Sequence, residues 1–152
     1  MCGEKRRDDF DIMHEMSNFE SEFKRRRIIM ETGLTHTSST VVDHSNTAIT
    51  LGSGDMPVFA TPAMLALMEN AAMLAVAGCL PEGSTTVGGH IESSHIKPSA
   101  LGATVEATAV LKECDGRKLT FSVEAWCNGE LIGKGSHLRF IVDRERFLAK
   151  LQ

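Results

Sequence analysis

The sequence predicts an α+β fold in which an antiparallel sheet wraps around one long central helix. Residues 61–78, TPAMLALMENAAMLAVAG, are almost entirely apolar, and a helix that is apolar on all sides must be covered on most of them. Residues 101–113 and 118–127 alternate between apolar and polar side chains, which is typical of strands with one buried face. Together these patterns predict a sheet whose apolar face covers the helix.

The central helix is predicted to span Pro62–Ala77, about 24 Å at 1.5 Å per residue. Thr61 is a favourable N-cap, proline needs no amide partner in the first turn, and Gly78 supplies a stop. One carboxylate, that of Glu69, interrupts the apolar run. A carboxylate that leaves water without a partner is costly, so its position asks for an explanation.

The chain before the helix changes character near residue 34. Residues 1–33 are predicted to form a helical N-terminal arm, because apolar side chains recur among many charges between residues 9 and 30, and the main domain is placed at residues 34–152. Residues 36–51, HTSSTVVDHSNTAITL, are rich in β-branched side chains and indicate one strand or two short ones. Residues 52–57, GSGDMP, are typical of a turn.

Four strands and a short helix are predicted after the central helix. The strands cover residues 85–98, 101–113, 118–127 and 130–143, and the closing helix covers residues 144–152. Asp115-Gly116 and Asn128-Gly129 are typical of two-residue hairpin turns. These strands therefore predict an antiparallel meander.

Composition limits the class of protein. A chain of 152 residues with 42% hydrophobic and 24% charged residues is typical of one globular domain. A net charge of −4 argues against a nucleic-acid partner, and no uncharged apolar run reaches the roughly 18 residues of a membrane span. The N-terminus lacks the apolar core of a signal peptide. The four cysteines form no C-x-x-C pair, which predicts reduced thiols and a cytoplasmic protein.

Glu69 is the first candidate for chemistry. It could be a solvent-facing residue beside Asn70 on a narrow wet stripe of the helix. It could equally be a base or nucleophile in an apolar pocket, where placed partners replace its water.

The strand at residues 85–98 carries the other candidates. His90 and His95 are an odd number of residues apart, so strand geometry places them on opposite faces, and no shared metal site is predicted. His95 has the parity of Val87, Gly89, Ile91 and Ser93 and is expected on the face that could meet Glu69, although a structural histidine is the simpler interpretation. Gly88-Gly89 indicates either a bulge or the close approach of a ligand, and its amides could stabilise an oxyanion.

These residues occur in a familiar order. The series VFATPAMLALMENAA, TTVGGHIESSHIKPSALG, LKECDGRKLTFSVEA and LIGKGSHLRFIVDRERFLAKL resembles the hotdog-fold thioesterases of the fluoroacetyl-CoA thioesterase type, from about Val58 to the C-terminus. The resemblance implies a sheet around a central helix and a homodimer, or a dimer of dimers, with acyl-CoA sites at the subunit interface.

The resemblance also implies a catalytic group of a threonine, a glutamate and a histidine, which fall on Thr61, Glu69 and His95. It places the glycine of the oxyanion site at Gly88, with Gly89 beside it. No metal or redox cofactor is expected, because coenzyme A enters as part of the substrate. Residues 52–59, GSGDMPVF, depart from the lid of the fluoroacetyl-selective enzyme, so no acyl group is predicted.

Two other functions remain open at this point. A non-catalytic acyl-CoA-binding or sensor module could use the same fold, although the N-terminal arm is short for a DNA-binding segment. A hydratase is the third reading, and it is disfavoured because no Asp and His pair falls on one loop.

Overall fold

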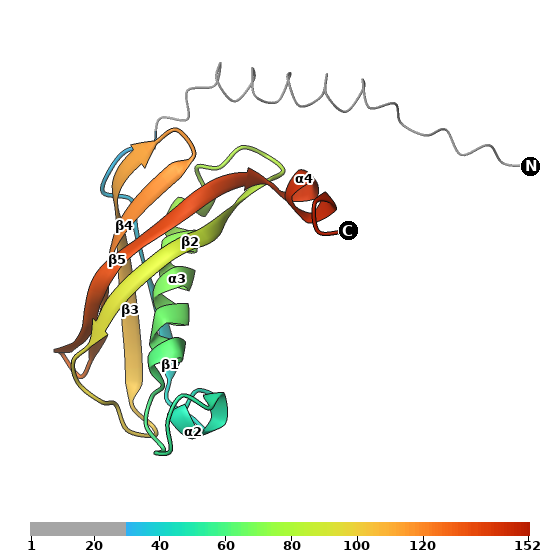
Figure 1. Cartoon of the computed structure of the whole chain (residues 1–152). Helices are drawn as coiled ribbons and strands as arrows, with labels where there is room; N and C mark the ends of the chain where they lie inside the picture. The colour runs from blue at the N-terminus through green and yellow to red at the C-terminus, as the bar shows by residue number, and fades with distance from the viewer. Residues whose placement is uncertain (1–29) are drawn as a thin grey trace, which may run out of the picture.

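A computed structural model describes residues 30–152, and most of the predicted arm therefore lies outside the described residues. A curved, five-stranded antiparallel sheet wraps around one long helix, as predicted (Figure 1). The strands are β1 (Thr35–Val41), β2 (Ser84–His95), β3 (Thr104–Asp115), β4 (Lys118–Cys127) and β5 (Glu130–Asp143). The helices are α2 (Ala48–Leu51), α3 (Thr61–Ala77) and α4 (Arg144–Ala149).

The strand order is β1-β3-β4-β5-β2. Strands β3, β4 and β5 form the predicted meander. The second hairpin turns at Asn128-Gly129 as predicted, whereas the first turns at Gly116-Arg117, one residue later than predicted, because Asp115 still pairs with Lys118. Strand β2 pairs with β5 at one edge of the sheet and not with β3, which follows it in sequence. The alternation of β3 and β4 is confirmed, because their inward side chains are fully buried: Val105, Ala107, Ala109, Leu111, Leu119, Phe121, Val123 and Ala125.

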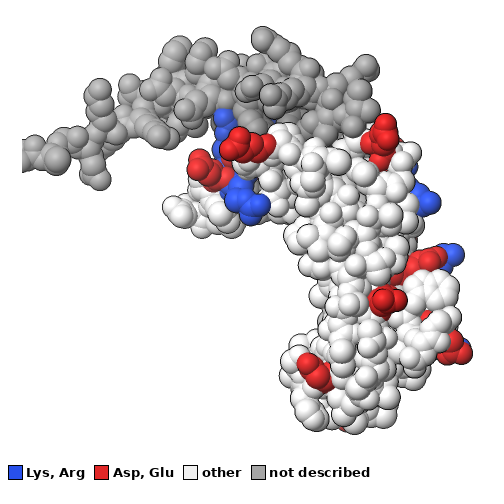
Figure 2. Space-filling model, turned by 180° about the vertical axis from the view of Figure 1, so that it is seen from behind, with Lys and Arg blue, Asp and Glu red and all other residues white. Residues whose placement is uncertain are grey.

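Helix α3 packs against the concave face of the sheet with one side only. Its buried residues are Met64, Met68, Ala71, Ala72 and Val76, and burying a methionine side chain contributes roughly 1.5–3 kcal/mol. On the other side Ala66, Asn70 and Leu74 are exposed. One sheet therefore leaves part of the apolar surface of this helix exposed. Seen from behind, the molecule shows few charged side chains (Figure 2).

The predicted role of Thr61 as N-cap is wrong. Ala60 is the N-cap and makes no side-chain cap hydrogen bond, while Thr61 is the first helical residue, followed by the proline of the first turn. Pro62 tolerates the missing amide partner there. The Thr61 hydroxyl is thus free for another partner.

The strand predicted over residues 36–51 ends at Val41, and a short helix, α2, follows. The Thr47 side chain accepts a hydrogen bond from the Thr50 amide, and Gly52 ends the helix with a φ of 71°. Local capping at both ends therefore overrides the β-branched composition of the segment.

A β-bulge at Gly88–His90 interrupts β2. Gly88 pairs with Arg139 and His90 with Leu138, which leaves Gly89 as the extra residue. Because a bulge shifts the alternation by one residue, the parity prediction is wrong for two positions: Val87 and Gly89 do not share the inward face of His95. The inward positions are Thr86 and Gly88 before the bulge and Ile91, Ser93 and His95 after it.

Among the described residues, no helix has the length and hydropathy needed to cross a membrane.

Candidate active site

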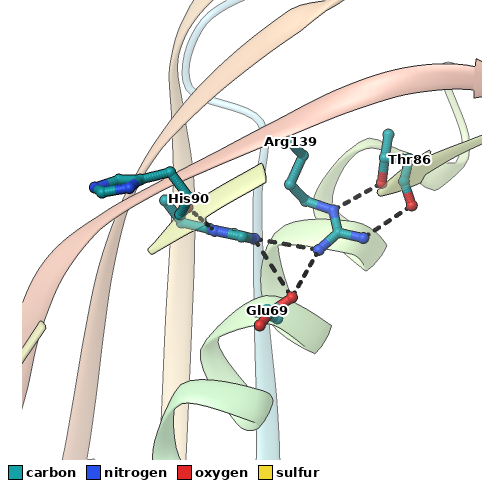
Figure 3. A network of polar contacts seen from close by, with 5 residues as sticks. Glu69, Thr86, His90 and Arg139 are labelled. Atoms are coloured by element: carbon teal, nitrogen blue, oxygen red, sulfur yellow. Dashed lines mark hydrogen bonds and ion pairs between the residues drawn. The ribbon is translucent and has the colours of Figure 1, made fainter. Parts of the chain in front are cut away.

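Glu69 lies in the middle of α3 beneath β2 and β5, and its partners come from the sheet (Figure 3). One carboxylate oxygen, Oε2, accepts a hydrogen bond from Nη1 of Arg139 at 3.4 Å. The Glu69 side chain is 41% exposed, whereas that of Arg139 is 7% exposed. The carboxylate therefore stands at the boundary between a buried cation and solvent.

Arg139 is fixed by the edge strand. Its Nε donates to the Thr86 hydroxyl at 2.8 Å and its Nη2 donates to the Thr86 carbonyl oxygen at 2.9 Å. Burial lowers the pKa of Arg139, and the charge of Glu69 opposes that shift. A guanidinium stays protonated at any ordinary pH. Arg139 therefore provides a fixed positive charge between the sheet and Glu69 of the helix.

His137 completes this cluster. Its Nδ1 lies 2.7 Å from the carbonyl oxygen of His90, and its Nε2 lies 3.2 Å from Nη1 of Arg139. A carbonyl only accepts, so Nδ1 carries the proton, and Nε2 then accepts from the guanidinium. Burial is the main cause that lowers the pKa of His137, and it favours this neutral form.

Thr61 and His95 form a second pair at the start of α3. The Thr61 hydroxyl lies 2.7 Å from Nδ1 of His95. Nε2 of His95 is buried and makes no hydrogen bond of ordinary geometry with residues 30–152. Burial lowers the pKa of His95, and a backbone interaction with Lys97 partly opposes this. The Thr61 hydroxyl is therefore the side-chain partner of this ring.

The structure brings the predicted site residues together as two separate groups. Thr61 lies with His95, while Glu69 lies with Gly88 and the Arg139 cluster. Eight residues of helix separate Thr61 from Glu69, which is about 12 Å along the axis. Within the described part of a single chain, His95 and Glu69 form no ion pair or hydrogen bond.

The two glycines of β2 have different neighbours. A Cβ atom at Gly88 would lie 2.8 Å from Oε2 of Glu69, so this glycine permits close contact with the carboxylate. A Cβ atom at Gly89 would instead collide with the ring of Phe140. Gly88 is therefore the glycine that adjoins the candidate site.

His137 and Arg139 were not among the residues predicted from sequence. A bulge in the β4–β5 pairing, between Ala125 and Trp126, shifts the register by one residue. A hairpin without that shift would place Ser136, Leu138 and Phe140 inward, which is also the more apolar set. Alternation along the sequence therefore favours the wrong face of β5. To predict that Arg139 points inward, one must first locate the bulge that shifts the register.

The described residues contain no group of three or more His, Cys, Asp and Glu side chains arranged to hold a metal ion.

Comparison with known proteins agrees with the fold. The family model for fluoroacetyl-CoA-specific thioesterases matches residues 42–145. The fluoroacetyl-CoA thioesterase of Streptantibioticus cattleyicolor is 38% identical over 95 residues, which cover 62% of this chain and 68% of that protein.

Solved structures give the same result. A crystallised fluoroacetyl-CoA thioesterase, FlK, has a TM-score of 0.76 at 34% identity and covers 80% of this chain and 95% of its own. A thioesterase superfamily member from Thermus thermophilus has a TM-score of 0.75 at 27% identity, covering 83% of this chain and 92% of its own. The expected fold and enzyme class are confirmed: this chain belongs to the fluoroacetyl-CoA-specific thioesterase family of hotdog-fold thioester hydrolases.

Proposed function

We propose that this protein hydrolyses an acyl-CoA thioester in a homodimer, at sites that combine Glu69 and Gly88 of one subunit with Thr61 and His95 of its partner. One observation carries this proposal. Thr61 and His95 lie together at the start of α3, whereas Glu69 of the same chain lies about two turns of helix away, beside Gly88.

Strand β2 offers the surface for such a pairing. It is an edge strand of twelve residues, and an unpaired edge is a template for another strand. Antiparallel pairing of β2 with its copy about a two-fold axis at Glu92 places Ile91 opposite the partner's Ser93. The extra residue of the bulge then sets Gly88 opposite the partner's His95. Every pair in this register joins positions on the same face of the sheet, as opposing residues must.

The proposed roles follow from the donors. In the proposed site we assign the Thr61 hydroxyl as donor to Nδ1 of His95, which leaves the ring proton on Nε2 for donation to the partner's Glu69. Glu69 attacks the thioester carbonyl carbon or takes a proton from the water that does. The amide of Gly88 or Gly89 stabilises the oxyanion, the C–S bond breaks, and coenzyme A leaves as the thiol after protonation. If Glu69 is the nucleophile, water then hydrolyses the acyl-glutamyl anhydride, which releases the free acid and restores the carboxylate; if Glu69 is the base, the attacking water gives the free acid directly. No metal or redox cofactor takes part.

The proposal also covers which acyl groups to test and where the protein is located. A relative acts on fluoroacetyl-CoA, so fluoroacetyl-CoA and acetyl-CoA head a screen of acyl chain lengths with detection of free thiol. Cys79, Cys114 and Cys127 are free thiols, which supports a cytoplasmic protein.

The test combines two inactive variants. Glu69→Gln removes the nucleophile or base but keeps the size of the side chain, and we expect a loss on the order of a hundredfold or more. His95→Ala should be similarly impaired. After subunit exchange, each mixed dimer holds one intact site and one doubly altered site, so about a quarter of wild-type activity should return.

Two outcomes would contradict the proposal. Wild-type turnover by Glu69→Gln alone would remove the carboxylate from the chemistry. Mixed dimers that form, as shown by mass spectrometry, but recover no activity would show that the site lies within one chain. His90→Ala, at an exposed position, serves as the matched control and should keep its activity.

A further inference from the structure

We propose that Arg139 is a positioning residue that holds one oxygen of the Glu69 carboxylate and leaves the other free to react, and that neutral His137 holds Arg139 in place. This inference rests on the proposed role of Glu69 in hydrolysis. It assigns a task to two buried polar residues that the proposed mechanism does not use.

The guanidinium is directed at Glu69 by the way in which its donors are used. Nε and Nη2 form one edge of the fork, and both bond to Thr86. Nη1 lies outside that edge, and it contacts both Oε2 of Glu69 and Nε2 of His137. The pair between Arg139 and Glu69 is therefore made through one nitrogen and one carboxylate oxygen and is not bidentate.

The carboxylate is consequently held at one oxygen. Oε2 faces Arg139 at 3.4 Å, whereas Oε1 accepts no hydrogen bond from any residue of the described part of the chain. The Glu69 side chain as a whole is 41% exposed, so a substrate or water molecule can approach it. Oε1 has two lone pairs and can accept from a water molecule and from a histidine at the same time.

His137 fixes the orientation of the guanidinium. Its Nδ1 donates to the backbone carbonyl of His90 at the bulge of β2, so Nε2 must act as an acceptor for Nη1 of Arg139. The 3.9 Å approach of Nε2 to Glu69 is therefore not an ion pair, because the ring is neutral in this arrangement. A second proton on His137 would face the guanidinium at 3.2 Å and repel it.

The cluster also links the carboxylate to the edge strand. Thr86 and the His90 carbonyl lie on either side of the Gly88–Gly89 bulge, and both hold residues of β5. The carboxylate position is thus defined by the same stretch of β2 that carries the oxyanion glycines. A misplacement on the order of 1 Å can cost about a hundredfold in rate, so such a link can affect turnover without touching the substrate.

Steady-state kinetics on variants of the full-length protein test the proposal. Arg139→Gln should lower kcat roughly tenfold to a hundredfold and leave KM within about threefold, since Arg139 does not contact the substrate. In the Glu69→Gln background, the same change should cause no further loss, because the residue that it positions is already disabled.

Two variants of Thr86 perturb the same contacts with a smaller structural change than Arg139→Gln. Thr86→Val removes the acceptor of the Arg139 Nε proton and should lower kcat several-fold, because a buried donor is left unsatisfied. Thr86→Ser keeps the hydroxyl and should retain wild-type kcat. This pair decides the question if Arg139→Gln fails to fold, and Thr85→Val controls for the loss of a hydroxyl on the same strand.

The outcomes separate this inference from the proposed function. If Glu69→Gln is inactive while folded Arg139→Gln keeps wild-type kcat, only the positioning role is overturned. A rise in KM at unchanged kcat, a further loss in the double variant, or equal kcat for Thr86→Val and Thr86→Ser would also overturn it. Wild-type turnover by Glu69→Gln would instead remove the proposed function itself.

Discussion

At the scale of single residues, the position of Glu69 depends on a small neighbour as much as on a charged one. Gly88 leaves room for Oε2 on the inner side of β2, and Arg139 provides the positive charge behind it. A carboxylate in an otherwise apolar helix is tolerated here because it is half exposed and paired at one oxygen. Sequence pattern finds the carboxylate and the glycine but not the arginine.

The two adjacent glycines predict opposite outcomes for the same substitution. Gly88→Ala places a methyl group 2.8 Å from Oε2 of Glu69 and should displace the carboxylate, lowering kcat by roughly tenfold or more. Gly89→Ala meets the ring of Phe140, which is 37% exposed and can turn toward solvent. Its activity should therefore stay near wild type. Equal loss of kcat in both variants, measured on folded protein, would contradict this assignment.

The two buried imidazoles predict a loss of stability in mild acid. Desolvation lowers the pKa of His95 and of His137. The unfolded chain then binds more protons than the folded chain, so this contribution is complete above the ordinary value of 6.5 and is lost as pH falls toward the lowered pKa. We expect the midpoint of urea unfolding to decrease between about pH 7.5 and pH 5.5 at fixed protein concentration.

The matched variant for this prediction is His137→Gln, whose midpoint should depend less on pH than that of the wild type. A wild-type midpoint that stays constant across the range would show that neither histidine is held neutral by the fold.

At the scale of elements, strict alternation of apolar and polar side chains correctly predicts which face of a strand is buried. Strands β3 and β4 match it because Val105 and Phe121 belong to continuous inward rows, and the Asn128-Gly129 turn has the positive φ values that its sequence suggests. Strands β2 and β5 are located correctly, but their inward faces do not follow from alternation, because the extra residues Gly89 and Ile132 interrupt them. The bulge between β3 and β4 comes only after the inward row from Val105 to Leu111. A bulge depends on how two strands pair, so the pattern within one strand does not predict where it lies.

The helix shows the same limit at its start. The N-cap assignment of Thr61 is wrong, and its hydroxyl instead contacts His95, 34 residues away. A tertiary contact therefore determines the role of Thr61, although local propensity favours an N-cap.

The pairing of β2 with β5 depends on a glycine, which yields a prediction at this scale. A Cβ atom at Gly135 would collide with the backbone carbonyl of Glu92, and backbone cannot move aside as a flexible side chain can. Gly135→Ala should force the two strands apart, lower the melting temperature by several degrees and reduce activity with it. Ser136→Ala, on the outer face, should do neither. A Gly135→Ala protein with wild-type melting temperature would contradict the close approach.

At the scale of the whole molecule, the sheet leaves one side of α3 uncovered. Exposed Leu74 and Ala66 lie on that side, and the strand that carries the candidate glycines has an open edge. Both features favour a second copy of the chain, and sedimentation should give at least twice the 16.5 kDa of one chain. The fold follows from the sequence because each element is locally specified, whereas the site draws on contacts that only the assembled sheet creates.

The position of β2 in the strand order has a consequence for how the chain is made. Ser93 pairs with Gly135, so β2 leaves the ribosome well before the strand that will bind it, whereas β3 and β4 close at once through a short turn. A strand that waits unpaired is exposed to wrong partners. The sequence STTVGGHIESSH, with two central glycines and only Val87 and Ile91 as large apolar residues, is poorly suited to form such contacts. The residues that shape the edge beside the candidate site thus also keep the waiting strand from forming such contacts.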